Sequence, residues 1–282
     1  MPKENVLVVG LGEVGRALFE LLKESERFSV YALDIDEEKM RQTGQKTLPE
    51  KVDVMHVCLP CPDQKKFVNT VANYVERFKP KLTIINSTVP PGTTQQVHTR
   101  CGCLVAHSPV RGVHESLEHM KWELKRWTKY VGGSEPKAAE AARKHFEKLG
   151  LKTKVLKGCL ETELAKLFET TYRAWMIACF QEMHRISMNF KADFDDTVDF
   201  LEDTHNVRFD RPIMFPDVIS GHCLIPNVES LLKSYNSEFL QLILKSNEVR
   251  KREVKNEVVQ AEIQKIKKRA EALQIELMKR QK

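Results

Sequence analysis

Residues 6–15 have the sequence VLVVGLGEVG, and this stretch decides the fold of the N-terminal half. Four aliphatic residues in succession are typical of a strand that is buried on both faces. Glycines follow with the spacing G-x-G-x-x-G, and a helical apolar pattern then begins at Val14. The first glycine permits a tight turn, the second lets a ligand approach the backbone, and the third allows close helix–strand packing. The stretch therefore predicts a βαβ unit that binds a dinucleotide at the N-terminus of its helix.

The end of the next predicted strand favours one dinucleotide. Asp34 closes the strand Ser29–Asp34 and comes 19 residues after Gly15. A carboxylate at this position accepts hydrogen bonds from ribose hydroxyls and repels a 2′-phosphate. We therefore expect NAD rather than NADP as the cofactor.

Strand-like and helix-like segments alternate as far as about residue 157. This alternation predicts an α/β fold, a doubly wound parallel sheet of the Rossmann type with crossover helices such as Val14–Lys23 and Phe67–Phe78. The predicted strands are Val6–Gly10, Ser29–Asp34, Val54–Leu59, Leu82–Ser87, Leu104–His107, Tyr130–Gly133 and Thr153–Leu156.

An all-α region is expected after the sheet. The pattern Leu160–Phe190 predicts one long helix with a broad apolar face, and Asp195–His205 predicts a second. Three prolines and a Ser-Gly pair make Pro212–Pro226 a predicted loop. A chain of 282 residues also favours more than one domain. We expect an NAD-binding domain at 1–157, a helical dimerisation and catalytic domain at 158–245, and a charged helical tail at 246–282.

The tail carries a heptad pattern. Its apolar residues are spaced 4, 3, 4, 3 and 4 apart: Val259, Ile263, Ile266, Ala270, Leu273 and Leu277. This spacing is typical of a short coiled coil, and a helix that packs on its own chain produces the same pattern. Both interpretations remain open at the level of sequence.

Composition and charge indicate which kinds of partner the protein is not expected to bind. The formal net charge is +6, and residues 248–282, with 11 Lys and Arg against 6 Glu, carry +5 of it. The rest is close to neutral, so we expect no nucleic-acid partner. No apolar run reaches the roughly 18–20 residues of a membrane span, so we expect no membrane partner. The strand-like start indicates no cleavable signal segment.

The seven cysteines lack the regular spacing of a disulfide framework, which favours the cytoplasm. Cys58 and Cys61 form a CxxC, and Cys101 and Cys103 form a CxC. Neither pair has the sequence context of a zinc knuckle, so we interpret them as structural thiols and expect no metal site.

Five further motifs occur in order along the chain. They are STVPPGTT at 87–94, HSPVRG at 107–112, KYVGG at 129–133, ELAKLFETTYRA at 163–174 and SGHCLIP at 220–226. Together they resemble the UDP-glucose/GDP-mannose dehydrogenase family of nucleotide-sugar 6-dehydrogenases, nearest the branch that oxidises UDP-N-acetylmannosamine. The resemblance extends from the N-terminus to about Leu232.

The resemblance implies an NAD-dependent oxidation of a sugar-nucleotide, or related sugar, primary alcohol to an acid. Cys223 would capture the aldehyde as a thiohemiacetal, whose oxidation gives a thioester. Lys166 would stabilise oxyanion charge, and Thr88 would hold a catalytic water. Arg111, Thr170 and His222 would contact the substrate, and the long helix would form a homodimer.

The cofactor would contact the glycine turn and the loops after the second, third and fourth strands. The residues expected to do so are Gly10, Gly12, Glu13, Val14, Gly15, Asp34, Ile35, Leu59, Pro60, Ser87 and Thr88.

Several positions depart from the family pattern. Thr170 replaces an asparagine, Asn227 replaces a catalytic aspartate, and Val110 replaces a glutamate. Asn227 cannot take up a proton as a carboxylate does, which bears on the second oxidation and on thioester hydrolysis. The family's third domain, which grips the nucleotide, is not expected after Leu232. Two alternatives therefore stand beside the leading one: a two-electron dehydrogenase of the β-hydroxyacid type, and a catalytically decayed NAD-binding subunit that docks a partner.

Overall fold

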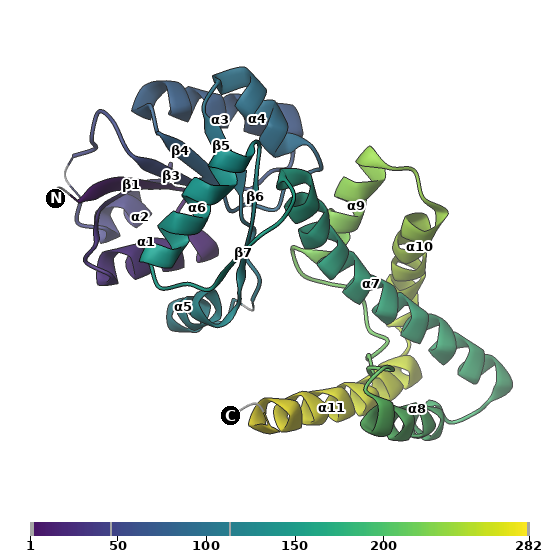
Figure 1. The fold of residues 1–282 in the computed structure, drawn as a ribbon. Coiled ribbons are helices and arrows are strands. Elements are labelled where there is room, and N and C mark those ends of the chain that lie inside the picture. Colours follow the sequence, from purple (N-terminus) through teal and green to yellow (C-terminus); the bar gives the residue numbers. More distant parts are fainter. Residues whose placement is uncertain (1–2, 46, 113, 281–282) are drawn as a thin grey trace. The chain divides into compact units, whose positions relative to one another are not determined.

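The computed structural model describes residues 3–45, 47–112 and 114–280, without the side chains of 273–280. The chain forms two compact units, residues 1–166 and 167–282. Figure 1 labels the elements of both. Among the described residues, no helix combines the length and the apolar character that crossing a bilayer requires.

The first unit is built on a seven-stranded sheet in the order β2-β1-β3-β4-β5-β6-β7. All neighbouring strands are parallel except β5 and β6, which pair antiparallel. The predicted fold class is therefore confirmed, and one pair departs from the parallel expectation. The strands are β1 Glu4–Val9, β2 Phe28–Leu33, β3 Val54–Val57, β4 Leu82–Ile85, β5 Leu104–His107, β6 Lys129–Gly133 and β7 Thr153–Val155.

Six helices cover the sheet: α1 Glu13–Glu24, α2 Glu37–Gln42, α3 Gln64–Phe78, α4 Thr93–Cys101, α5 Leu117–Arg126 and α6 Pro136–Lys148. Alternate residues of β1 enter two separate cores. Val6 and Val8 pack in a cluster with residues of α1, α5 and α6, and Leu7 and Val9 pack in another with residues of α3 and α4. A strand covered on both faces needs apolar residues at every position, which explains the unbroken aliphatic run.

The second unit is helical. The long helix α7, Cys159–Phe190, begins in the first unit and continues into the second. It is followed by α8 Phe194–Arg208, α9 Leu224–Ser234, α10 Glu238–Glu253 and α11 Glu257–Arg280. The predicted loop is three residues too long, because α9 already begins at Leu224. Pro226 is the third residue of that helix, where a missing N–H costs no intrahelical hydrogen bond.

The heptad pattern of the tail lies on α11, which packs against its own chain. Val259, Ile263 and Ile266 are 4%, 2% and 1% exposed. Arg269 forms ion pairs with Asp195, Asp199 and Glu202 of α8. The intramolecular interpretation is therefore confirmed for these residues, and the side chains of Leu273 and Leu277 lie outside the described ones.

A buried arginine joins three helices of the second unit. Arg250 of α10 is fully buried and donates to the Gln181 carbonyl oxygen of α7 at 2.9 Å and to His184 Nδ1 at 3.3 Å. Because His184 Nδ1 accepts this bond, its proton lies on Nε2 and is donated to Glu262 of α11 at 2.6 Å. Desolvation and the neighbouring guanidinium lower the pKa of His184. Arg250 thus links α10 to α7, and His184 extends this network to Glu262 of α11.

The packing of α11 yields a first prediction. We expect Ile266→Ala to destabilise the second unit by about 2–5 kcal/mol, because it leaves a cavity in a packed core. Val258→Ala, at a position 61% exposed, should change stability by no more than about 0.5 kcal/mol. Urea unfolding measures both. Equal effects of the two variants would contradict the intramolecular packing.

Candidate active site

The loops after β1 to β4 hold the residues predicted to bind the cofactor. These strands are parallel neighbours, so their carboxyl ends lie at one edge of the sheet. Strands β2 and β3 lie on opposite sides of β1, so the strand order reverses beside β1, and open α/β sheets bind ligands at such a point. The residues gathered at this edge are Gly10, Gly12, Glu13, Val14, Gly15, Asp34, Ile35, Leu59, Pro60, Ser87 and Thr88.

The glycine turn has the geometry of a phosphate cradle. Gly10 has φ +91°, which favours glycine, and a Cβ on Gly15 would lie 1.8 Å from the Gly10 carbonyl oxygen. A Cβ on Gly12 would meet nothing within 4 Å, so the space above this residue is open. Gly12 is also the N-cap of α1 and makes no side-chain capping bond. The N–H groups and positive dipole end of α1 therefore suit a pyrophosphate.

Asp34 ties the end of β2 to this turn. Its carboxylate accepts the Leu11 N–H at 2.5 Å and the Asp36 N–H at 2.9 Å. Ile35, the next residue, is 95% exposed. A cavity of about 340 Å³ lies here. Its lining residues are Leu11, Arg16, Asp36, Glu38, Lys39 and Gln42.

Glu163 of α7 organises the loop after β4. Its carboxylate accepts the Gly92 N–H at 2.6 Å, the Thr94 N–H at 2.8 Å and the Thr94 hydroxyl at 2.6 Å. Gly92 is the N-cap of α4 and has no side chain to cap it, so Glu163 does so from another helix. Burial raises the pKa of Glu163, and these three bonds act in the opposite direction. Nothing local in the sequence assigns this role, although Glu163 precedes Lys166 by one helical turn.

The first turn of α7 also holds the end of β5. Thr162 and His107 are joined by a 2.8 Å hydrogen bond, and His107 Nε2 donates to the Ser87 carbonyl oxygen at 3.0 Å. Burial lowers the pKa of His107 to about 3, so its ring is neutral. Lys166 lies one turn along α7 and is half-buried, and its charge contributes to this lowering. The predicted lysine is thus carried by a helix end fixed to two strand ends.

Lys129 is a buried amine at the same edge. It begins β6, is 4% exposed, and its ammonium donates to the Ser108 and Pro109 carbonyl oxygens at 3.0 and 3.2 Å. Desolvation lowers the pKa of Lys129 to about 7, with smaller contributions from Arg111 and Lys166. The burial of Lys129 cannot be predicted from the sequence, because a lysine at the start of a strand is expected to be exposed.

Arg111 and Val110 follow β5. Arg111 donates to the Thr128 carbonyl oxygen at 3.0 Å, and its guanidinium lies 4.7 Å from the centre of the Trp127 ring. Val110 is buried in the hydrophobic cluster that includes α1 and α5. The structure therefore places a core residue where the family has a glutamate.

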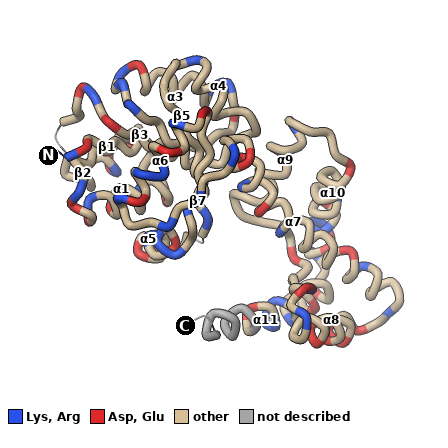
Figure 2. Tube along the Cα trace, viewed as in Figure 1, with Lys and Arg blue, Asp and Glu red and all other residues tan. Residues whose placement is uncertain are grey.

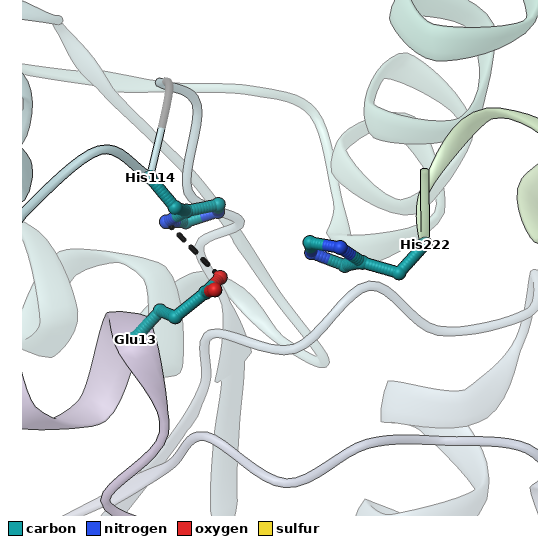
Figure 3. A group of neighbouring side chains, drawn as sticks. All are labelled: Glu13, His114 and His222. Atoms are coloured by element: carbon teal, nitrogen blue, oxygen red, sulfur yellow. Dashed lines mark ion pairs between the residues drawn. The ribbon is translucent and has the colours of Figure 1, made fainter. Parts of the chain in front are cut away.

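Glu13 and His114 are held together at the start of α1. Figure 3 shows this ion pair, with His114 Nδ1 3.5 Å from a Glu13 carboxylate oxygen. Glu13 is the first residue of α1 and belongs to the predicted cofactor-binding set. The pair links the glycine turn to the loop after β5.

The remaining predicted residues lie in the second unit. Cys223 is the N-cap of α9, and its carbonyl oxygen accepts the Asn227 N–H at 3.0 Å. Asn227 Nδ2 donates to the Thr170 hydroxyl oxygen at 3.0 Å, and that hydroxyl donates to the Leu167 carbonyl oxygen. His222 is exposed. Thr170 and Asn227, the two residues of this unit that depart from the family pattern, therefore contact each other, and neither side chain is charged.

Burial keeps three of the four thiols of the cysteine pairs protonated. Burial raises the pKa of Cys58 to about 12 and that of Cys101 to about 11, and it also raises the pKa of Cys103. Metal ligation requires thiolates, so these environments do not favour it.

Comparison with known proteins finds a family model that matches the central segment of the chain. Residues 160–250 match the model of the UDP-glucose/GDP-mannose dehydrogenase family, central domain. This segment is similar to the central domain of that family. The resemblance expected from the motifs is thereby confirmed.

Similar proteins extend the family resemblance beyond this segment. A curated UDP-N-acetyl-D-mannosamine dehydrogenase from Methanocaldococcus jannaschii is 27% identical over 261 residues, 78% of this chain. The chain spans 60% of that relative's length.

Solved structures share the fold. The UDP-D-ManNAc dehydrogenase of Pyrococcus horikoshii aligns with a TM-score of 0.73 and 22% identity, over 88% of this chain and 68% of its own. The 3-hydroxyisobutyrate dehydrogenase of Mycobacterium tuberculosis aligns with a TM-score of 0.66 and 14% identity, over 94% and 99%.

The buried Lys129 yields a prediction of pH dependence. Above about pH 7 the folded protein has lost this proton, whereas an unfolded lysine keeps it to about pH 10.4. The unfolded state then binds more protons, so the stability of the wild type should rise relative to Lys129→Met between pH 7 and 10. The slope is at most about 1.4 kcal/mol for each pH unit.

Urea unfolding at several pH values measures this difference. Lys65→Met, at an exposed position of α3, controls for the loss of a lysine charge. Parallel stability curves for the wild type and Lys129→Met would contradict a buried, readily deprotonated amine.

Proposed function

We propose that this chain is an NAD-dependent oxidoreductase that converts the primary alcohol of a sugar nucleotide to an acid. The observation that carries the proposal is the family match of residues 160–250, the segment that contains Cys223 and Lys166. The open N-terminus of α1 and the position of Asp34 support NAD as the cofactor. The names of the curated relatives support a UDP-N-acetyl-D-mannosamine-like substrate.

The residues of the chain have distinct chemical tasks in this proposal. NAD, when bound, supplies the acceptor for the hydrides that oxidation of an alcohol releases. Cys223 adds its sulfur to the aldehyde carbon, and the aldehyde oxygen takes up a proton to give a thiohemiacetal. Lys166 stabilises the negative charge that develops on this oxygen. A second two-electron oxidation leaves a thioester, which water, held by Thr88, hydrolyses to the acid and the free thiol.

The hydrogen bond between Thr170 and Asn227 favours a second candidate. Neither side chain takes up a proton near neutral pH, so no carboxylate at position 227 assists a second oxidation or hydrolysis. A two-electron dehydrogenase of the β-hydroxyacid type needs neither step. The likeness to 3-hydroxyisobutyrate dehydrogenase concerns the fold alone.

Counting NADH tests the two candidates. We expect wild-type protein to form two NADH per sugar nucleotide, and Cys223→Ser to form acid at least about 100-fold more slowly, because it lacks the thiolate nucleophile. Cys101→Ser removes a half-buried thiol at the end of α4 and serves as the control.

Three other outcomes are informative. One NADH per substrate with full turnover by Cys223→Ser would favour the two-electron candidate. NAD binding without turnover of any UDP- or GDP-sugar would point to a decayed subunit that docks a partner. Absence of NAD binding by the folded protein would contradict the proposal.

We further propose that the chain forms a homodimer through α7. An apolar stripe runs along the part of this helix in the second unit, with Phe168, Tyr172, Ile186 and Phe190 between 51% and 76% exposed. Cys179 lies on the same stripe, which follows spacings of 4, 7, 7 and 4 residues. Exposed apolar surface of this extent on one helix is typical of a protein contact.

Light scattering tests the dimer. We expect a species of about twice the 32.6 kDa chain mass at micromolar concentration, and a monomer for Ile186→Glu, since a buried unpaired carboxylate is costly. Glu169→Gln, at an exposed position beside the stripe, is the control. A monomeric wild type would contradict the proposal.

The compartment proposed is the cytoplasm. The seven cysteines form no disulfide with one another in the described part of the chain, which suits a reducing environment.

A further inference from the structure

Two cysteines separated by a glycine connect helix α4 to strand β5. Cys101 is the last residue of α4, Gly102 is its C-cap with φ +63°, and Cys103 directly precedes β5. Glycine adopts this left-handed conformation more readily than any other residue. Each of the two thiols affects the pKa of the other, so they lie close together. The first unit thus carries a dithiol at the amino end of β5.

His98 of α4 fixes the turn that contains this dithiol. Its carbonyl oxygen accepts the Gly102 N–H at 2.8 Å, and its Nδ1 donates to the Cys103 carbonyl oxygen at 2.7 Å. One residue therefore holds the backbone on both sides of the turn. Two sulfur atoms that are already held in a short, fixed turn lose little chain entropy when they join.

Both cysteines line a cavity of about 630 Å³ between the C-terminal parts of α3 and α4. These two helices pack side by side (Figure 1). Strands β4 and β5 are parallel and begin here, so the cavity lies at the edge of the sheet opposite the cofactor loops. The other polar side chains that line it belong to Asn73, Glu76, Lys79 and Arg100.

The charges around the cavity favour a ligand that carries carboxylates. Lys79 and Arg100 supply two exposed cations against the one carboxylate of Glu76. Figure 2 shows basic segments on both α3 and α4. Cys101 and Cys103 are half-buried, so a small molecule in the cavity can reach them. A half-exposed cysteine beside a cation is the usual setting of a thiol that reacts.

The pKa values of the two thiols bear on the redox chemistry of the pair. Burial raises the pKa of Cys101 to about 11, and the Arg100 charge acts in the opposite direction. Burial also raises the pKa of Cys103. Strongly oxidising dithiol pairs owe their potential to a reduced state that an ionised thiol stabilises. This pair lacks that stabilisation, so its oxidation to a disulfide is favoured, although a small thiolate fraction makes the reaction slow.

We propose that Cys101 and Cys103 form a reversible disulfide by exchange with a small, carboxylate-bearing disulfide that binds in this cavity. The Cys101 thiolate attacks one sulfur of the small disulfide, whose S–S bond breaks and releases one small thiol. Cys103 then attacks the Cys101 sulfur, the mixed disulfide breaks, and the second small thiol leaves. The protein gives up two electrons and two protons, and the small disulfide takes up both to become two thiols.

Peptide mass spectrometry tests the disulfide directly. Trypsin cleaves after Arg100 and Arg111 and releases residues 101–111, which contain Cys101, Cys103 and no other cysteine. We expect this peptide to become about 2 Da lighter after the folded protein is incubated with dithiodipropionate, because two hydrogen atoms leave the thiols. Dithiothreitol should restore two thiols that iodoacetamide alkylates.

Two cysteine variants separate the steps of the exchange. Cys103→Ser should keep one half of the probe on Cys101 as a stable mixed disulfide, because the thiol that resolves it is gone. Cys179→Ser removes an exposed thiol of the second unit and should form the Cys101–Cys103 disulfide as the wild type does. Thermal unfolding verifies that each variant is folded.

A neutral probe tests the role of the cavity charges. Dithiodipropionate carries two carboxylates, whereas hydroxyethyl disulfide carries none. We expect Lys79→Gln to slow the reaction with dithiodipropionate about three-fold and to leave that with hydroxyethyl disulfide unchanged. Lys65→Gln makes the same change of charge near the start of α3, outside the cavity, and should react with both probes as the wild type does.

Three results would overturn the proposal: a peptide 101–111 that keeps both thiols after incubation, a folded Cys103→Ser that takes up no adduct at Cys101, or a folded Lys79→Gln that reacts with dithiodipropionate as fast as the wild type. The dithiol and the cofactor loops lie at opposite edges of the sheet. The disulfide can therefore form, or fail to form, whether or not the protein oxidises a sugar nucleotide.

Discussion

The close approach of α1 to β1 is the constraint on which the first unit depends. The helix begins where the strand ends, and only a residue without a Cβ at position 15 fits against the Gly10 carbonyl oxygen. This contact fixes the direction of α1, so that its first N–H groups point over the edge at which four strand ends meet. Asp34 then reinforces the turn from β2 by accepting the Leu11 N–H. The cradle is thus a result of backbone geometry, and its side chains mainly hold that geometry in place.

The first turn of α7 performs a comparable task on the other side of the same edge. Thr162 holds His107, and Glu163 caps α4, so a single turn of helix fixes the ends of two neighbouring strands. Lys166 follows on the same helix face. A lysine on a rigid helix loses less freedom when it meets a ligand than one on a loop, which suits the role proposed for Lys166.

The features predicted from the sequence are those that depend on local pattern. The strands, the glycine turn and the long helix follow from residues close together in the chain, and the motifs carry the family resemblance. The capping of α4 by Glu163 joins residues 69 apart, and the Thr170–Asn227 bond spans 57. The spacing of apolar residues in the sequence does not reveal contacts between residues so far apart in the chain. The heptad pattern of α11 was ambiguous for the same reason, since the surface it packs against lies on α8, far along the chain.

The Thr170–Asn227 bond also has a consequence for how this protein can change. The bond lies in a buried position, so replacing Thr170 removes the acceptor of the Asn227 amide, at a cost of about 1–3 kcal/mol. A charged carboxylate at 227 would further require a donor in place of the Thr170 hydroxyl, which already donates to the Leu167 carbonyl oxygen. The two positions are therefore expected to vary together among related sequences. A change from this uncharged pair to one with a carboxylate at position 227 would pass through a less stable single variant. Such a step slows the exchange of one pair for the other.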